Sequence, residues 1–293
     1  MKLRNVMVVI TALTVGGTIL VIQTGGLTQT LRAVQSFFGL EASYAADAGE
    51  HMRVEGQSAT DYRWSGSLAQ GASLEIKGVN GSITVELAEG DEVLVTAEAR
   101  SRRSDPSSVR IERVEHAGGL TFCAVYPTPE GKRANECAPG SDGRMSTNRN
   151  DTRVDFLIRV PAGAPFIGRT VNGSVDARGL RSDVTALTVN GDIEVSTTGF
   201  ARAETVNGSI QASMGSVPLE GDMEFSTVNG SIELDLPDDI DAELDANWLN
   251  GSFETDIPFL LEGGVSRRSA RGVLGNGGPK LELETVNGSI RIR

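Results

Sequence analysis

The sequence predicts an all-β solenoid, in which the chain winds through stacked coils and each coil contributes strands to the walls of one core. The pentad Val-Asn-Gly-Ser-Ile and its close variants occur seven times, and most neighbouring copies are about 20 residues apart, a period typical of solenoid coils. Apolar and polar residues alternate after each pentad, as they do in a half-buried strand. The repeated pairs are Asn80 and Gly81, Asn172 and Gly173, Asn190 and Gly191, Asn207 and Gly208, Asn229 and Gly230, Asn250 and Gly251, and Asn287 and Gly288.

Asn-Gly between apolar residues is also the usual signal of a β-hairpin, so the two folds must be separated. In a two-residue hairpin, Val228 and Ile232 would lie on opposite faces. In a chain that runs straight through, Val228, Ile232 and Leu234 share one apolar face, because side chains alternate along a strand. The same in-phase run recurs at residues 187–195 and 79–87. We therefore predict straight-through strands, with Val228 facing the core.

A change of phase marks the corner of each coil. Met223 and Phe225 alternate with each other, but Val228 breaks their register by one residue, and such a slip requires a bend or a bulge. We expect a corner just before the Asn-Gly pair, where glycine lets stacked backbones approach closely. Stacked asparagine side chains would form a hydrogen-bonded ladder along the solenoid. A second turn is expected near Gly179, Gly199 or Gly221.

The coils are predicted to form one domain, residues 51–293, with insertions at about 101–151 and 258–279. The first insertion contains both cysteines, and the second contains an arginine-rich stretch with a Gly-Asn-Gly-Gly turn. We expect the last coil of the sequence to be the last of the stack. Residues 284–293 would then cover the coil around Leu249 and Phe253, and their alternating arginines would protect an exposed strand edge.

Residues 1–50 are predicted to direct export. Lys2 and Arg4 precede an uncharged apolar run, residues 6–22, which we expect to form a hydrophobic helix. The basic start places the rest of the chain outside the cytoplasm. The run is long for a signal-peptide core and short for a bilayer span, so a cleaved signal and a retained membrane anchor both stay open. The expected location is the cell envelope, in the periplasm or at the cell surface.

Composition limits the partners and the chemistry. A net charge of −12 argues against nucleic acid, which requires clustered Lys and Arg. The two histidines, His51 and His116, and the two cysteines lack any metal-binding spacing, so we expect no metal and no cofactor. An even cysteine pair in an exported chain favours a disulfide between Cys123 and Cys137. A reduced, buried pair is the alternative.

Several segments resemble one known family. They are FLIRVP at 156–161 leading to TVNGSV at 170–175, the coil at Leu236 and Pro237, GNGG at 275–278 and TVNGSI at 285–290. With these segments the chain resembles the bacterial "putative adhesin" domain, a domain of unknown function with Asn-Gly β-solenoid repeats in exported proteins. The resemblance covers roughly residues 68–293. It implies a right-handed β-solenoid in the envelope, and it implies no catalytic residues.

These observations predict a non-enzymatic envelope scaffold or adhesion module that binds a surface ligand, either a glycan or a protein. One alternative is an extracytoplasmic sensor domain of an envelope-stress or signalling system. The other is a glycan-cleaving β-helix enzyme, for which Asp176 and Glu194 would be the acid and base candidates. No aromatic platform for sugar rings accompanies them, so a solvated face is the better interpretation. The outward column after each pentad reads Thr84, Asp176, Glu194, Gln211, Glu233, Glu254 and Arg291.

Overall fold

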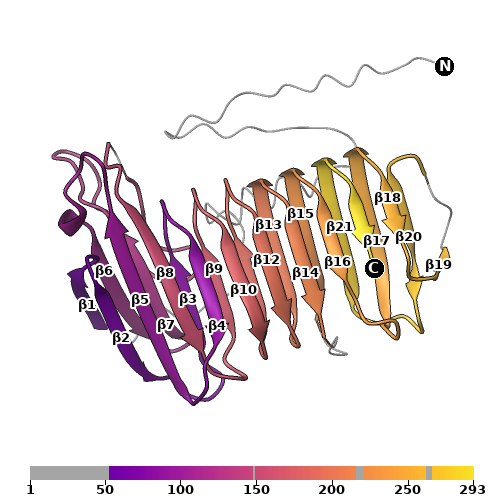
Figure 1. The fold of residues 1–293 in the computed structure, drawn as a ribbon, viewed down its shortest axis with the longest axis horizontal. Coiled ribbons are helices and arrows are strands. Elements are labelled where there is room, and N and C mark those ends of the chain that lie inside the picture. The colour runs from indigo at the N-terminus through magenta and orange to yellow at the C-terminus, as the bar shows by residue number, and fades with distance from the viewer. Residues whose placement is uncertain (1–52, 148, 216–220, 262–265) are drawn as a thin grey trace.

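The computed structural model describes residues 53–147, 149–215, 221–261 and 266–293, which form two long β-sheets facing each other (Figure 1). The predicted all-β solenoid is therefore confirmed, whereas its right-handed sense stays a prediction. The expected hydrophobic helix and membrane anchor at residues 6–22 lie outside the described residues. In the part of the chain that is described, no helix is long and apolar enough to span a membrane.

Twelve strands form the first sheet, here called the A sheet, and ten form the second, the B sheet. In spatial order the A sheet contains β1 (Arg53–Ser58), β6 (Arg110–His116), β7 (Gly119–Val125), β3 (Ser73–Lys77), β9 (Phe166–Arg169), β11 (Val184–Leu187), β13 (Ala201–Asn207), β15 (Met223–Asn229), β21 (Lys280–Asn287), β17 (Ala242–Asn250), β20 (Ser269–Leu274) and β19 (Phe259–Leu261). The B sheet contains β18 (Phe253–Thr255), β22 (Ile290–Ile292), β16 (Ile232–Asp235), β14 (Ile210–Met214), β12 (Ile193–Thr197), β10 (Val175–Leu180), β4 (Ile83–Leu87), β8 (Arg153–Val160), β5 (Glu92–Arg100) and β2 (Tyr62–Ser67).

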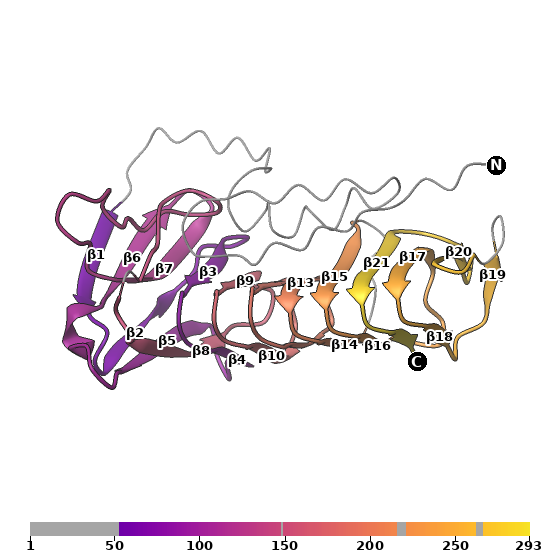
Figure 2. The same ribbon diagram turned by 90° about the horizontal axis from the view of Figure 1, so that it is seen from above.

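Each coil gives one strand to each sheet, and the strands of successive coils are parallel (Figure 2). In stacking order, the pairs in the described residues are β7 with β8, β3 with β4, β9 with β10, β11 with β12, β13 with β14, β15 with β16, β21 with β22 and β17 with β18. The chain thus runs straight through each pentad from the A sheet to the B sheet, as predicted, and forms no hairpin at the Asn-Gly pairs. The pentads form the corner between the two sheets.

The corner lies later than the phase analysis predicted. β15 continues through Thr227 to Asn229, and β16 begins at Ile232, so the turn falls at the Asn-Gly-Ser segment itself. Thr227 is buried in phase with Met223 and Phe225, whereas Val228 is only partly buried. The prediction that Val228 faces the core was wrong. The change of phase is absorbed after the valine, and the inward position at the corner belongs to the preceding threonine.

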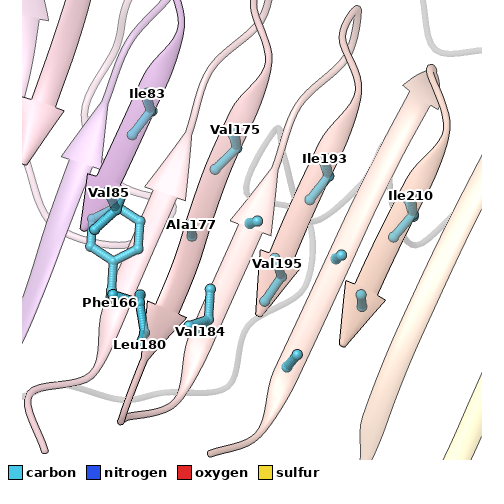
Figure 3. Close-up of a cluster of buried hydrophobic side chains, with 14 of the residues drawn as sticks. Ile83, Val85, Phe166, Val175, Ala177, Leu180, Val184, Ile193, Val195 and Ile210 are labelled. Atoms are coloured by element: carbon cyan, nitrogen blue, oxygen red, sulfur yellow. The ribbon is translucent and has the colours of Figure 1, made fainter. Parts of the chain in front are cut away.

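The core is a set of aligned apolar rows between the two sheets. Ile83, Val175 and Ile193 are in register on adjacent B-sheet strands, and each is almost wholly buried (Figure 3). Phe166 and Val184, which are paired in register on the A sheet, pack further along the strands, close to Val85 and Leu180. Because each inner side chain packs on equivalent residues above and below it, a coil cannot bury its inner face without its neighbours.

The stacking order departs from the order of the sequence at the C-terminal end. The last coil in sequence, β21 with β22, lies between the β15–β16 coil and the β17–β18 coil (Figure 1). The expectation that residues 284–293 are the terminal cover of the stack was therefore wrong. The β17–β18 coil is terminal. After it the chain turns back, and β21 and β22 form the coil between β15–β16 and β17–β18.

Antiparallel strands extend both sheets at the N-terminal end and the A sheet at the other. β5 and β2 continue the B sheet beyond β8, while β6 and β1 continue the A sheet beyond β7. At the opposite end β20 and β19 extend the A sheet beyond β17. Much of the segment predicted as the first insertion is regular structure, because it contains β6, β7 and the short 3-10 helix η1 (Pro106–Ser108). The second insertion contains β19 and β20.

Candidate functional site

The pentad glycines allow the close stacking of the coils. A Cβ atom added at Gly191 would lie 2.2 Å from the carbonyl oxygen of Gly173, and one at Gly208 would lie 2.0 Å from that of Gly191. The same clash recurs at each pentad along the stack. Of the seven pentad glycines, only Gly81 has a positive φ, 134°. Glycine is needed here for close approach of backbones and not for a left-handed turn.

The pentad asparagines form one continuous amide ladder along the corner. The side-chain Nδ2 of Asn190 donates to Oδ1 of Asn172 at 2.9 Å, and Asn207 donates to Asn190 at 2.8 Å. The complete ladder runs through Asn80, Asn172, Asn190, Asn207, Asn229, Asn287 and Asn250, in the order of the stack. Because these amides satisfy one another, the arrangement stabilises the stack and supplies no evident reactive group.

A second ladder, formed by threonine, was missed by the sequence analysis. The hydroxyl of Thr227 donates to the carbonyl oxygen of Gly208 in the preceding coil at 2.8 Å. Thr170, Thr188, Thr205 and Thr285 make equivalent bonds. The signal was present in the sequence as threonine two residues before the asparagine in most pentads. The glycine carbonyl accepts this bond at the inner side of the corner, which explains why threonine and not valine faces inward.

The first and the last pentads of the stack lack this threonine. The equivalent position is Gly78 in the first pentad coil and Trp248 in the terminal one. Trp248 is buried and stacks on Phe253 with ring centroids 5.5 Å apart, and Phe253 in turn meets Phe259 edge to face at 6.1 Å. The aromatic cluster covers the end of the core where no further coil follows.

The outward column of the B sheet contains the carboxylates that the enzyme alternative would use. Asp176 and Glu194 are adjacent in register, and both pair with Arg178, at 2.8 and 2.6 Å. They lie side by side on a sheet face rather than across a groove. A shallow hollow of about 450 Å³ at the N-terminal end is lined by Arg63, Arg159 and neighbouring residues, and it includes neither carboxylate. This geometry does not arrange the two as an acid and a base flanking a substrate bond.

The order of the outward column differs from the sequence order in one respect. Arg291 lies between Glu233 and Glu254, because β22 pairs with β16 on one side and with β18 on the other. Its guanidinium pairs with Glu254 at 2.5 Å, while Arg293 pairs with Glu233 at 2.5 Å. Stacking in chain order would have placed Glu233 and Glu254 next to each other.

A disulfide between Cys123 on β7 and Cys137 holds the first insertion against the outer face of the A sheet, with the Cα atoms 5.7 Å apart. Lys77 adds a second attachment: its buried ammonium donates to the carbonyl oxygens of Ala138, Gly140 and Asp142 at 2.8, 2.9 and 2.9 Å. Burial lowers the pKa of Lys77, and the nearby Glu75 partly opposes this shift. The role of this site is to fix the insertion loop.

Within the described ranges, no group of three or more His, Cys, Asp or Glu side chains is arranged to hold a metal ion. His116 lies on β6 and takes part in a hydrogen-bond chain with Thr121 and Glu75. His51 lies outside the described residues.

No curated protein matches the chain. A "putative cell adhesion protein" from Clostridium sporogenes ATCC 15579 is 12% identical, covers 83% of this chain and 99% of its own, and has a TM-score of 0.31. A "putative adhesin" from Bacteroides fragilis NCTC 9343 is 11% identical, with 79% and 96% covered and a TM-score of 0.24. The family Toastrack DUF4097 matches residues 70–293, and the chain therefore belongs to this family, as the resemblance of its pentad coils had indicated.

Proposed function

We propose that this protein is an exported, non-enzymatic binding scaffold of the cell envelope, and that the outer face of the B sheet is its binding surface. The observation that carries the proposal is the in-register outward column, which places one polar side chain per coil from Thr84 to Glu254. Adjacent strands are about 4.8 Å apart, so the column is a regularly spaced row. Such a row suits an extended ligand with a linear repeat.

The chemistry of this face favours a glycan chain as the ligand. Carboxylates such as Glu194 accept from sugar hydroxyl groups, and amide and hydroxyl side chains such as those of Gln211 and Ser213 both donate and accept. Protein partners usually bind through buried aromatic or arginine anchors. In the described residues, the exposed large apolar side chains are Leu157, Leu260 and Leu261, and only Leu157 belongs to this face.

The export part of the proposal is supported by the disulfide. Disulfides persist in oxidising compartments such as the periplasm and the cell surface, and are rare in the cytosol. The structure joins Cys123 to Cys137, and the N-terminal sequence has the composition of an export signal. Attachment to the membrane through residues 6–22 is part of the same proposal.

The test is a glycan-binding screen with the full-length protein and two matched double variants. Glu194→Gln with Gln211→Ala changes the B-sheet column, whereas Glu243→Gln with Thr185→Ala makes equivalent changes on the outer face of the A sheet. We expect loss of glycan binding only in the first variant. Equal binding by both variants would refute the B-sheet assignment, and cleavage of a bound glycan would refute the non-enzymatic role.

A further inference from the structure

Arginines gather where the antiparallel ladder of β5 and β8 ends. Arg100 and Arg153 are the last residues of this ladder and lie opposite each other. Each has a carboxylate partner: Glu98 is 2.6 Å from Arg100, and Asp155 is 2.8 Å from Arg153. The strand arginines at this edge are therefore already neutralised locally.

Three further arginines follow in the two loops beyond this ladder, and none of them pairs with a carboxylate of the described residues. They surround a hollow of about 410 Å³ that is lined by Arg102, Arg103, Ser104, Arg149, Asn150 and Asp151. Among the residues that the structure describes, Arg102, Arg103 and Arg149 form no ion pair, although most arginines on the strands do. All three are exposed around one opening. Like charges gathered in this way repel one another unless an anion binds between them.

The loop backbones that carry the arginines are fixed by hydrogen bonds. The carboxylate of Asp151 accepts from the backbone N–H of Arg103 at 3.2 Å and of Ser104 at 2.8 Å, while Ser104 Oγ accepts from the backbone N–H of Asp151 at 3.1 Å. Arg149 has a φ of 62°, a left-handed conformation that is uncommon for residues other than glycine. The next residue, Asn150, is held through Ser108 and Thr152. These hydrogen bonds hold together the backbone segments that carry the arginines.

The charge of this region is opposite to that of the rest of the protein. Residues 100–153 contain ten Lys and Arg against seven Asp and Glu, in a chain whose net charge is −12. The residues that line the hollow include three arginines and one aspartate, a net charge of two positive charges. A phosphate monoester carries about 1.5 to 2 negative charges at neutral pH, and inorganic phosphate is a mixture of the monoanion and the dianion. The planar guanidinium also matches the oxygens of phosphate in a bidentate way.

We propose that this hollow binds a dianionic phosphate group, with Arg102, Arg103 and Arg149 as its ligands. The site lies at the end of the β5–β8 ladder and outside the outward column of the B sheet. Neither proposal depends on the other. The bound phosphate is either free in solution or the terminal group of a larger molecule, and the two sources share the same recognition chemistry.

The experiment compares two pairs of consecutive, exposed arginines in the full-length protein. Arg102→Gln with Arg103→Gln removes two ligands of the hollow. Arg267→Gln with Arg268→Gln removes the same charge at the opposite end, where no ion pair of either arginine is seen within the described ranges. Inorganic phosphate is titrated by calorimetry at constant ionic strength, and thermal melts in phosphate and in chloride provide a second readout, because a ligand of the native state raises the Tm.

We expect the first variant to bind phosphate at least tenfold more weakly and to lose the phosphate-dependent rise in Tm, with the second variant unchanged. Arg149→Lys should weaken binding less than Arg149→Gly, since lysine keeps the charge. Vesicles of phosphatidylcholine with and without phosphatidic acid distinguish a lipid phosphate from the free anion. Equal loss in both arginine-pair variants, or no binding by the wild type, would overturn the proposal.

Discussion

At the corner of each coil, three neighbouring positions have three different tasks. Threonine faces inward and satisfies a glycine carbonyl of the preceding coil, as Thr227 does for Gly208. Asparagine points outward and extends the amide ladder, as Asn229 does on Asn207. Glycine keeps the backbones close enough for both bonds. The pentad is therefore a structural unit. Its repeated threonine, asparagine and glycine positions hold neighbouring coils together.

The glycine position gives the sharpest prediction at this scale. Gly208→Ala would place a Cβ atom 2.0 Å from the carbonyl oxygen of Gly191, and we expect it to lower the free energy of unfolding by about 3 kcal/mol, the upper part of the usual range for overpacking. Gly90→Ala is the control, because nothing lies within 4 Å of its Cβ position and its φ is not positive. Its change should stay within about 0.5 kcal/mol. Denaturant melts measure both, and similar losses would contradict the close-approach argument.

At the scale of elements, the sequence allowed prediction of the strands but not of every boundary. Strands such as β12 and β16 were predictable because alternation and glycine placement are local properties. The corner was misplaced by about one residue because the change of phase between Phe225 and Ile232 can be absorbed on either side of Val228. The position of the corner is decided by the Gly208 carbonyl, which accepts from Thr227. This carbonyl belongs to the neighbouring coil, so the sequence of one pentad does not reveal it.

The β6–β7 hairpin contains a titratable group that predicts a pH dependence. Burial lowers the pKa of His116, with Glu75 opposing the shift. Its Nδ1 accepts from the backbone N–H of Gly118 at 3.2 Å, so Nε2 carries the proton toward Thr121, 3.1 Å away, and Thr121 donates to Glu75. This chain requires the neutral imidazole.

Because the folded pKa of His116 lies below its usual value near 6.5, the unfolded chain binds more protons in the window just below pH 6.5. The contribution of His116 to stability should therefore be complete above pH 6.5 and decline as the pH falls through the lowered pKa. We expect the stability of the wild type to decline more steeply in this window than that of His116→Gln. Melts of both proteins across the window measure the difference, and parallel curves would show that the histidine is not linked to folding.

For the whole molecule, the order of the coils is the feature that the chain order did not predict. A 37-residue step separates Asn250 from Asn287, and a segment of this length can return to either side of the β17–β18 coil. Two residues indicate the observed choice. Trp248 replaces the threonine that five of the other six pentads carry and therefore suits a terminal position, and Arg291 separates Glu233 from Glu254. Both signals are evident only when the coils are compared with one another.

Engineered disulfides at the pentad serines test this order directly. Ser289 Oγ lies 3.1 Å from Ser252 Oγ, and its backbone N–H donates to Ser231 Oγ at 3.2 Å, so Ser289 is adjacent to both serines. Ser231→Cys with Ser289→Cys, and Ser252→Cys with Ser289→Cys, should each form a disulfide under mild oxidation. Ser231→Cys with Ser252→Cys is the matched pair that stacking in chain order would join. In the observed order, one coil lies between these two positions, which are therefore about two strand spacings, or roughly 10 Å, apart. This exceeds the Cα separation of about 7 Å that a disulfide tolerates.

Non-reducing peptide mapping identifies each bond, with the Cys123–Cys137 link as the internal reference. A cross-link in the third pair without one in the first would show that the final coil covers the end of the stack, and the role of Trp248 as its terminal residue would then be wrong.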